Sequence, residues 1–178
     1  MSSIPTDLIS DSDSDRLVIQ KIGDHIMQNT SLTYQDDGRD EEELSIYPEE
    51  IQNMFFLWSF ICDAGGNGLI VHVSQTSGYL IKGEHRALSA IDFSRLVGLY
   101  EQAIALSATP DEDGEMWAEY TYEIEDISWF KKFKTDIKLD SAEEVLDTQD
   151  TFNMINEEIS SVAANYISSK VRPYFAQI

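Results

Sequence analysis

Residues 48–63, PEEIQNMFFLWSFICD, form the most apolar stretch of the chain. The proline and the two glutamates that open it suit the first turn of a helix, where a missing N–H costs nothing and negative charge is favoured. The apolar side chains that follow recur at helical spacing and leave little polar face, so we predict a central, buried helix. Gly65, Gly66 and Gly68 come next, and we expect them to end this helix at about Asp63.

Helical periodicity recurs on both sides of this segment. Apolar residues at spacings of three and four predict further helices over residues 15–29, 84–91, 94–106, 141–147 and 150–171. We expect Pro173 to end the last of them, because proline lacks the N–H that a helix interior needs. Residues 69–73 fit either a strand or a short helix.

The predicted fold is therefore mainly all-α, a single-domain multi-helix bundle over residues 15–178. A flexible acidic leader is expected over residues 1–14, which are rich in serine and aspartate and lack periodicity. A short strand or irregular segment is expected near residues 117–125, where polar and apolar side chains alternate. Residues 127–137 return to helical spacing.

The composition is that of a folded, non-exported protein. With 178 residues, of which 42% are hydrophobic, the chain is long enough to bury one core. Residues 1–10 contain no lysine or arginine, and aspartates follow where a signal peptide would be apolar. No apolar stretch reaches the length of a membrane span. Cys62 is the only cysteine, which fits a reducing compartment, so we expect a cytoplasmic protein without membrane association.

Negative charge is the most unusual property of this sequence. The formal net charge is −21, and it is concentrated in two segments. Residues 1–50 carry 13 acidic and 3 basic side chains, and residues 101–150 carry 15 and 4, whereas the other two parts of the chain are balanced. This distribution predicts a neutral helical core flanked by two acidic surfaces.

These acidic surfaces are the predicted site of interaction. We expect no direct binding to nucleic acid, because phosphate groups are bound by lysine and arginine, which carboxylates outnumber here by 33 to 12. A basic protein is the expected partner, in particular a DNA-binding regulator or a nucleoid protein, because charge complementarity steers association. The predicted contact residues are Asp36, Asp37, Asp40, Glu41, Glu42, Glu43, Glu49, Glu50, Asp111, Glu112, Asp113, Glu115, Glu119, Glu123 and Glu125.

Candidate metal and catalytic residues do not occur at informative spacings. The aspartates of residues 11–15 resemble the start of a calcium loop, but Arg16 and Ile22 stand where glycine and glutamate are required. The three histidines lie on separate segments, and Cys62 is predicted to be a buried structural thiol. The lysines of residues 131–138 are expected to form ion pairs on a helix face. We therefore expect no metal, no cofactor and no catalytic residue, and no enzymatic activity.

Residues 65–78, GGNGLIVHVSQTSG, followed by ALSAIDF at residues 87–93, carry a family resemblance. Together with the aromatic helix before them they resemble the acidic bacterial DNA-mimic proteins, a family of small helical domains of unknown function. The family motif contains Asn-Asn-Gly-Gly-Phe, which is degenerate in this chain. The residues that correspond to the structural motif are Trp58, Gly65, Gly66, Gly68, Ser77 and Gly78. The resemblance implies an all-helical fold, a homodimer, and occupation of the DNA-binding surface of a repressor.

Three functions therefore remain open at this stage. The first is an acidic protein–protein interaction module that acts as a DNA mimic. The second is an immunity-type antitoxin that blocks a basic nuclease, which the same charge supports. The third is a small-ligand-binding or enzymatic domain that uses a pocket at the glycine loop and His72.

Overall fold

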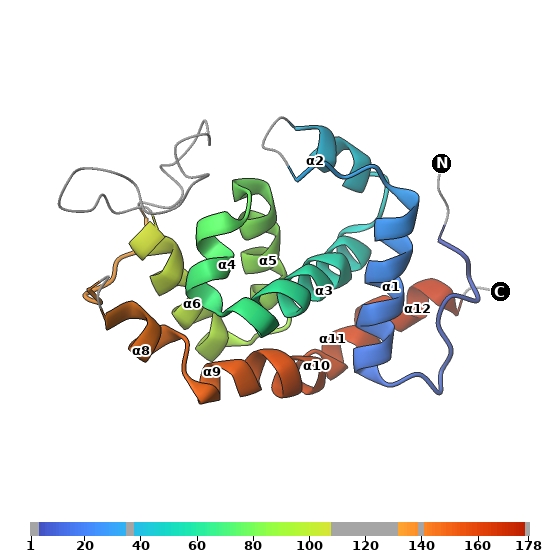
Figure 1. Ribbon diagram of the computed structural model, residues 1–178. Coiled ribbons are helices and arrows are strands. Elements are labelled where there is room, and N and C mark those ends of the chain that lie inside the picture. Colours follow the sequence, from blue (N-terminus) through green and yellow to red (C-terminus); the bar gives the residue numbers. More distant parts are fainter. Residues whose placement is uncertain (1–3, 35–37, 108–131, 139–140, 177–178) are drawn as a thin grey trace.

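The apolar helix predicted from residue 48 is the central element of the structure, α3 (Glu49–Asn67). The computed structural model describes residues 4–34, 38–107, 132–138 and 141–176. Within these ranges the fold is an all-helical bundle without strands, as predicted (Figure 1). The other elements are α1 (Asp15–Asn29), α2 (Arg39–Leu44), α4 (Leu69–Gln75), α5 (Gly78–Ala90), α6 (Ser94–Ser107), α8 (Ala142–Leu146), α9 (Gln149–Asn153), η2 (Met154–Glu158), α10 (Ile159–Val162), α11 (Ala164–Tyr166), η3 (Ile167–Val171) and α12 (Arg172–Phe175).

Two glycines let α1 and α5 pack closely on the two sides of α3. A Cβ atom at Gly23 of α1 would lie 2.1 Å from the Cγ atom of Trp58, and one at Gly83 of α5 would lie 2.2 Å from a ring carbon of Phe56. Large aromatic side chains of α3 therefore occupy the space that a side chain on the neighbouring helix would need. Figure 1 shows α3 between α5 and α1, with the C-terminal helices crossing below.

The predicted end of the central helix at Asp63 is wrong, because α3 continues through Gly65 and Gly66 to Asn67. The helix ends at Gly68, whose φ of 87° only glycine adopts without strain. Gly65 serves close packing instead: a Cβ atom there would lie 2.6 Å from Oδ1 of Asn156, whose amide donates to the Gly65 carbonyl at 2.9 Å.

Residues 69–73, for which strand and helix were both open, belong to the helix α4. The start of α4 is stabilised by a distant carboxylate, since Asp147 accepts a hydrogen bond from the Leu69 N–H at 2.6 Å. A carboxylate at this position satisfies an otherwise unpaired donor and complements the helix dipole. The connection between α8 and α9 thereby fixes the position of α4.

The C-terminal helix is longer than predicted and alternates between α and π geometry. Its buried apolar residues repeat every four positions at Ile155, Ile159, Ala163, Ile167, Val171 and Phe175. In a pure α-helix of 3.6 residues per turn, a four-residue repeat would rotate by about 40° at each step and leave the core. A π turn holds more residues than an α turn because its hydrogen bonds span five residues. The segments η2 and η3 therefore keep the repeat on one face.

Pro173 does not end this helix, contrary to the prediction, but lies within α12 directly after η3. Irregular hydrogen bonding in the preceding π segment reduces the cost of the missing proline N–H, and helix kinks at proline and at π segments are common. The helix continues to Phe175, which is buried.

The leader predicted as flexible packs against the bundle where the structure describes it. Ile4 and Ile9 are buried in the core. Arg172 of α12 donates to the carbonyl oxygens of Ser10 and Asp13 at 2.9 and 2.7 Å. Two apolar side chains and these hydrogen bonds replace the expected loose segment, and the two ends of the described chain lie near each other (Figure 1).

Residues 132–138 form no helix, although helical spacing was predicted for Phe133 and Ile137. Both side chains pack against the core, while Lys132, Lys134 and the other even-numbered residues are exposed. This alternation is typical of an extended chain. The strand or irregular segment predicted near 117–125 lies outside the described residues.

Within the described ranges, no single helix is long and apolar enough to cross a membrane. The helices α3 and α4 meet the length and composition criteria only as a pair, which is bent by 119°.

Candidate functional site

The first predicted acidic surface is centred on the short helix α2. Glu41 and Glu42 are exposed on this helix, and Glu43 is half-buried. Glu49 is exposed and Glu50 is half-buried in the first turn of α3. These carboxylates therefore remain available to a partner to different degrees. Asp36 and Asp37 lie outside the described residues, as do Asp111, Glu112, Asp113, Glu115, Glu119, Glu123 and Glu125.

Asp40 is not a contact residue, contrary to the prediction, because it is only 3% exposed. Its carboxylate accepts hydrogen bonds from the backbone N–H groups of Thr33 and Tyr34, at 2.7 and 2.5 Å, and from the Thr33 hydroxyl at 3.1 Å. Tyr34 has a φ of 58°, which is unfavourable for a non-glycine residue. Asp40 thus holds the chain before α2 in a strained turn.

Glu43 further secures α2 by accepting a hydrogen bond from the Ser31 N–H at 2.6 Å. Two of the four consecutive acidic residues at 40–43 therefore attach the helix to the preceding segment. The other two, Glu41 and Glu42, are presented outward from a fixed support.

The residues of the structural motif lie around the two ends of α4, except Trp58, which lies in the middle of α3 and faces α1. Gly68 precedes this helix, and Ser77 and Gly78 follow it as the N-cap and first residue of α5. Gly66 lies within α3 with no heavy atom within 4 Å of a Cβ position. Trp58 stacks on Phe55 with ring centroids 5.9 Å apart and covers the Gly23 position of α1. Trp58, Gly65 and Gly68 of the motif therefore have structural roles in helix packing and helix termination.

A buried polar cluster formed by Asp63, His72, Glu84 and Tyr100 was not predicted. His72 of α4 is 1% exposed and lies between two carboxylates: its Nδ1 is 2.6 Å from Oδ2 of Asp63, and its Nε2 is 2.7 Å from Oε2 of Glu84. The Tyr100 hydroxyl donates to the same Glu84 oxygen at 2.7 Å. These four residues come from α3, α4, α5 and α6 and connect these helices inside the core.

The geometry of the polar cluster fits a protonated His72. An ionised carboxylate only accepts hydrogen bonds, so a carboxylate at each ring nitrogen pairs with an imidazolium that donates from both. Burial disfavours this charge, but the charge of Glu84 and the hydrogen bonds of both carboxylates outweigh burial and raise the pKa of His72 to about 9. Neither nitrogen is free for a ligand, which disfavours a ligand site at His72.

The pKa values of Asp63 and Tyr100, the other titratable members of the polar cluster with a shift, move in opposite directions. The hydrogen bond from His72 lowers the pKa of Asp63 below its ordinary value, and Asp63 is the cluster member that reaches solvent. Burial first, and then the charge of Glu84, raise the pKa of Tyr100 well above its ordinary value, so the hydroxyl remains a donor. Among the described residues, Oε1 of Glu84 has no hydrogen-bond partner although the residue is fully buried.

The raised pKa of His72 predicts that the protein loses stability in mild alkali. Folding raises this pKa from 6.5 to about 9, so the stabilisation is complete below pH 6.5 and disappears as the pH rises through 9. We expect the free energy of unfolding to fall by about 3 kcal/mol over this interval. Urea unfolding at a series of pH values measures how steeply the free energy of unfolding falls with pH. A His72→Gln variant should lose most of this pH dependence. The same pH dependence in both proteins would show that His72 does not cause the loss of stability in alkali.

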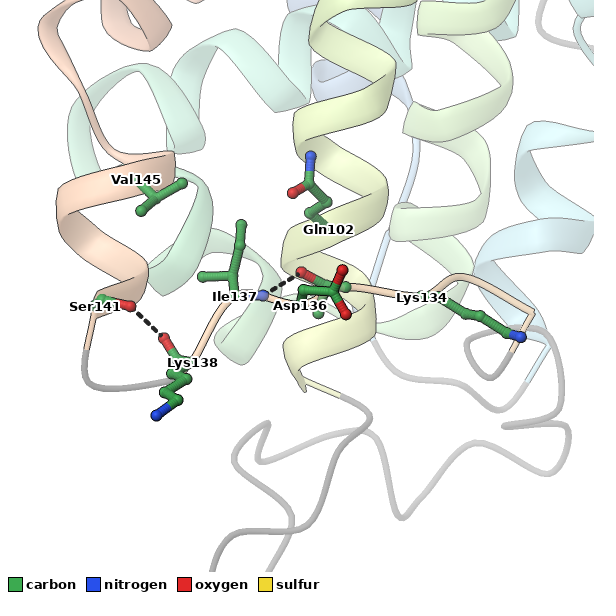
Figure 2. A pocket seen from close by; sticks show the side chains of 8 residues that line it. Gln102, Lys134, Asp136, Ile137, Lys138, Ser141 and Val145 are labelled. Carbon is green, nitrogen blue, oxygen red and sulfur yellow. Dashed lines mark hydrogen bonds between the residues drawn. The ribbon is translucent and has the colours of Figure 1, made fainter.

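A surface pocket of about 740 Å³ lies between α6, α8 and residues 132–138 (Figure 2). In Figure 2, Lys134 and Lys138 extend away from α6, with Asp136 between them. The predicted helix face is therefore not formed over residues 132–138, which the structure describes as non-helical. The pocket is lined by Gln102, Lys134, Thr135, Asp136, Ile137, Lys138, Ser141 and Val145.

The described residues contain no group of three histidine, cysteine, aspartate or glutamate side chains arranged to hold a metal ion. Cys62 is exposed, contrary to the prediction of a buried thiol. No family model, curated protein or solved structure matches this chain. Its function is therefore inferred from its own charge and geometry.

One sequence signal points to the polar cluster. Glu84 stands among Leu80, Ile81 and Leu88 on the buried face of α5. A carboxylate on an apolar helix face needs a buried partner, because an unpaired charge in the core is strongly unfavourable. The position of Glu84 therefore indicates a cationic partner, but the helical spacing does not identify His72.

Proposed function

We propose that this chain is an acidic protein–protein interaction module that binds the basic, nucleic-acid-binding surface of a DNA-binding protein, and so acts as a DNA mimic. The net charge of −21 supports a basic partner, since opposite charges steer association and like charges prevent it. On this proposal the chain has no catalytic residue and works by occupying a surface.

The arrangement of α2 is the observation that carries the proposal. Asp40 and Glu43 attach this helix to residues 31–34, and Glu41 and Glu42 point to solvent. Carboxylates on a fixed support lose little conformational entropy on binding, which favours affinity. Duplex DNA also presents its phosphates on a stiff scaffold, so a mimic needs such rigid presentation.

Neutralisation of this surface tests the proposal. In the triple variant Glu41→Gln, Glu42→Gln, Glu49→Gln we expect association with a captured DNA-binding protein to slow by about tenfold and to become less sensitive to salt. Stability should change little, because these side chains are exposed. The rate is measured by surface plasmon resonance at several salt concentrations, with duplex DNA as competitor.

The matched control removes three exposed carboxylates elsewhere, by Glu143→Gln, Glu157→Gln and Glu158→Gln. Both variants have the same net charge, so only the position of the loss differs. Equal binding by the two variants, or a complex that duplex DNA does not displace, would refute a specific role of α2.

A further inference from the structure

The guanidinium group of Arg86, on α5, is held in a fixed position although the residue is exposed. Its Nε donates to Oδ1 of Asn53 at 3.1 Å, and its Nη2 donates to Oε1 of Gln52 at 3.2 Å. The group also lies over the ring of Phe56, 5.3 Å from the ring centroid. Asn53 and Phe56 are each 1% exposed, so the core side of α3 supplies a rigid support.

These contacts leave one edge of the guanidinium group free. Nε and Nη2 form one side of the planar group, and both donate to side-chain amides of α3. The N–H groups that remain, on Nη1 and Nη2, form the end of the fork, which can bind a carboxylate through two parallel hydrogen bonds. Within the ranges that the structure describes, Arg86 makes no ion pair. Its two hydrogen-bond acceptors are neutral, so they do not offset its charge.

Arg86 lies beside the acidic residues in the first turn of α3. Asn53, which holds it, follows Glu49 by four positions and Glu50 by three, and residues at these spacings are neighbours on a helix surface. Tyr166 accepts a hydrogen bond from the Asn53 amide at 2.9 Å. Burial raises the pKa of this tyrosine, the charges of Glu50 and Glu49 raise it further, and the charge of Arg86 lowers it. A fixed positive charge therefore adjoins these carboxylates.

We propose that Arg86 selects among basic partners by receiving an aspartate or glutamate side chain of the bound DNA-binding protein. This inference rests on the proposed function and adds the charge pattern of the partner, a basic surface with a carboxylate opposite Arg86. A uniformly basic surface would place like charge against the guanidinium group, and such a repulsive contact discriminates against wrong partners. Because α3 already fixes the group, little conformational entropy is lost when the carboxylate binds.

A carboxylate carried by a partner suits this position better than a free one. A single exposed ion pair contributes little to affinity, so a small carboxylate in solution would bind Arg86 weakly. The net charge of −21 would also repel a free anion. A carboxylate on a docked protein is brought to Arg86 by the basic side chains around it, and its pairing is then effectively intramolecular. The ligand that this surface favours is therefore a side chain of the partner.

Two synthetic polymers test whether Arg86 distinguishes these charge patterns. Poly-lysine has no carboxylate side chains, whereas a random copolymer of lysine with a minority of glutamate carries both charges. Arg86→Gln should bind poly-lysine about threefold more tightly than the original chain does, because a like charge is removed. For the copolymer this gain should disappear or reverse, because the variant has no partner for glutamate. Fluorescence anisotropy of labelled polymers at one salt concentration measures the dissociation constants.

The captured DNA-binding protein gives the second measurement. Arg86→Gln should raise its dissociation rate about tenfold, because loss of a paired interface charge acts mainly on dissociation. This change is opposite in sign to the poly-lysine result. Arg86→Lys keeps the charge but not the fork, so it should restore only part of the affinity. Arg95→Gln is the matched control: it makes the same charge change on α6, where Arg95 pairs with Asp150, and should leave dissociation unchanged. Circular dichroism verifies the fold of each variant.

The outcomes separate this inference from the proposed function. The role of Arg86 is overturned, and the acidic surface stands, if the triple variant of Glu41, Glu42 and Glu49 associates slowly while Arg86→Gln binds the protein and poly-lysine more tightly. Equal dissociation rates of Arg86→Gln and Arg95→Gln also overturn it. If the triple variant binds as fast as the original chain, the proposed function fails and this inference fails with it.

Discussion

Replacement of His72 with leucine is expected to lower the free energy of unfolding by about 3–5 kcal/mol. The variant removes the cation between Asp63 and Glu84 and leaves the carboxylate of Glu84 inside the core, where the residue is fully buried. An uncompensated buried charge is among the most destabilising changes known, because it loses hydration without gaining a partner. Urea unfolding at pH 6.5, followed by circular dichroism, measures the loss.

Two variants distinguish the buried charge from ordinary loss of packing. The double variant His72→Leu, Glu84→Leu removes both charges, so it should be more stable than His72→Leu alone. His85→Leu provides a surface control, because His85 lies 2.8 Å from Glu101 in a pair that is partly open to solvent. Its cost should remain below about 1 kcal/mol. A double variant less stable than His72→Leu alone would show that packing, and not charge, dominates.

Substitution of Gly23 or Gly83, the glycines of α1 and α5 that contact aromatic rings of α3, is the second change expected to lower stability strongly. We expect Gly83→Ala and Gly23→Ala each to lower the free energy of unfolding by about 1–3 kcal/mol. The new methyl group would overlap the ring of Phe56 in the first case and of Trp58 in the second. Phe56 is 1% exposed and belongs to the hydrophobic core, so either its ring or α5 must shift, and both changes disturb the packing between α3 and α5. Urea unfolding of each variant and of the original chain at one pH measures the change in the free energy of unfolding.

Gly98→Ala is the matched control for these substitutions. Gly98 lies within α6, and a Cβ atom there would meet no heavy atom within 4 Å. Alanine should therefore stabilise the protein by about 0.5–1 kcal/mol through the lower flexibility of the unfolded chain. If all three variants were equally stabilised, close contact would not be the reason for glycine at 23 and 83.

The helices that local periodicity describes well were predicted closely. For α1 the predicted residues 15–29 match the observed bounds, and Ser14 caps the helix through a hydrogen bond from the Leu17 N–H at 3.3 Å. The necessary information lies within one or two turns of the sequence, namely apolar residues on one face and an oxygen-bearing side chain before them. Tertiary contacts only reinforce such a helix.

The errors occur where contacts between distant residues decide the structure. Gly65 was expected to end a helix, yet it is helical because Asn156 packs there. The strand-or-helix ambiguity at residues 69–73 is resolved by Asp147, which lies 78 positions from Leu69. Asp40 was predicted to be exposed from its charge alone, but backbone donors of residues 33 and 34 bury it. None of these partners is visible in a window of local sequence.

Arg172 has a consequence for how the chain is connected. Its hydrogen bonds to Ser10 and Asp13 hold the last helix against residues 10–13, so a short flexible linker could join residues near the two ends of the described chain (Figure 1). Domains with adjacent ends usually tolerate circular permutation. New ends opened at the exposed Gly38 would cut the backbone between residues 31–34 and α2 and leave only the hydrogen bonds of Asp40 and Glu43 to hold this helix. Such a permutant would keep the same acidic residues and net charge as the original chain. A difference in partner binding between the two would then report the backbone connection before α2 and not the number of carboxylates.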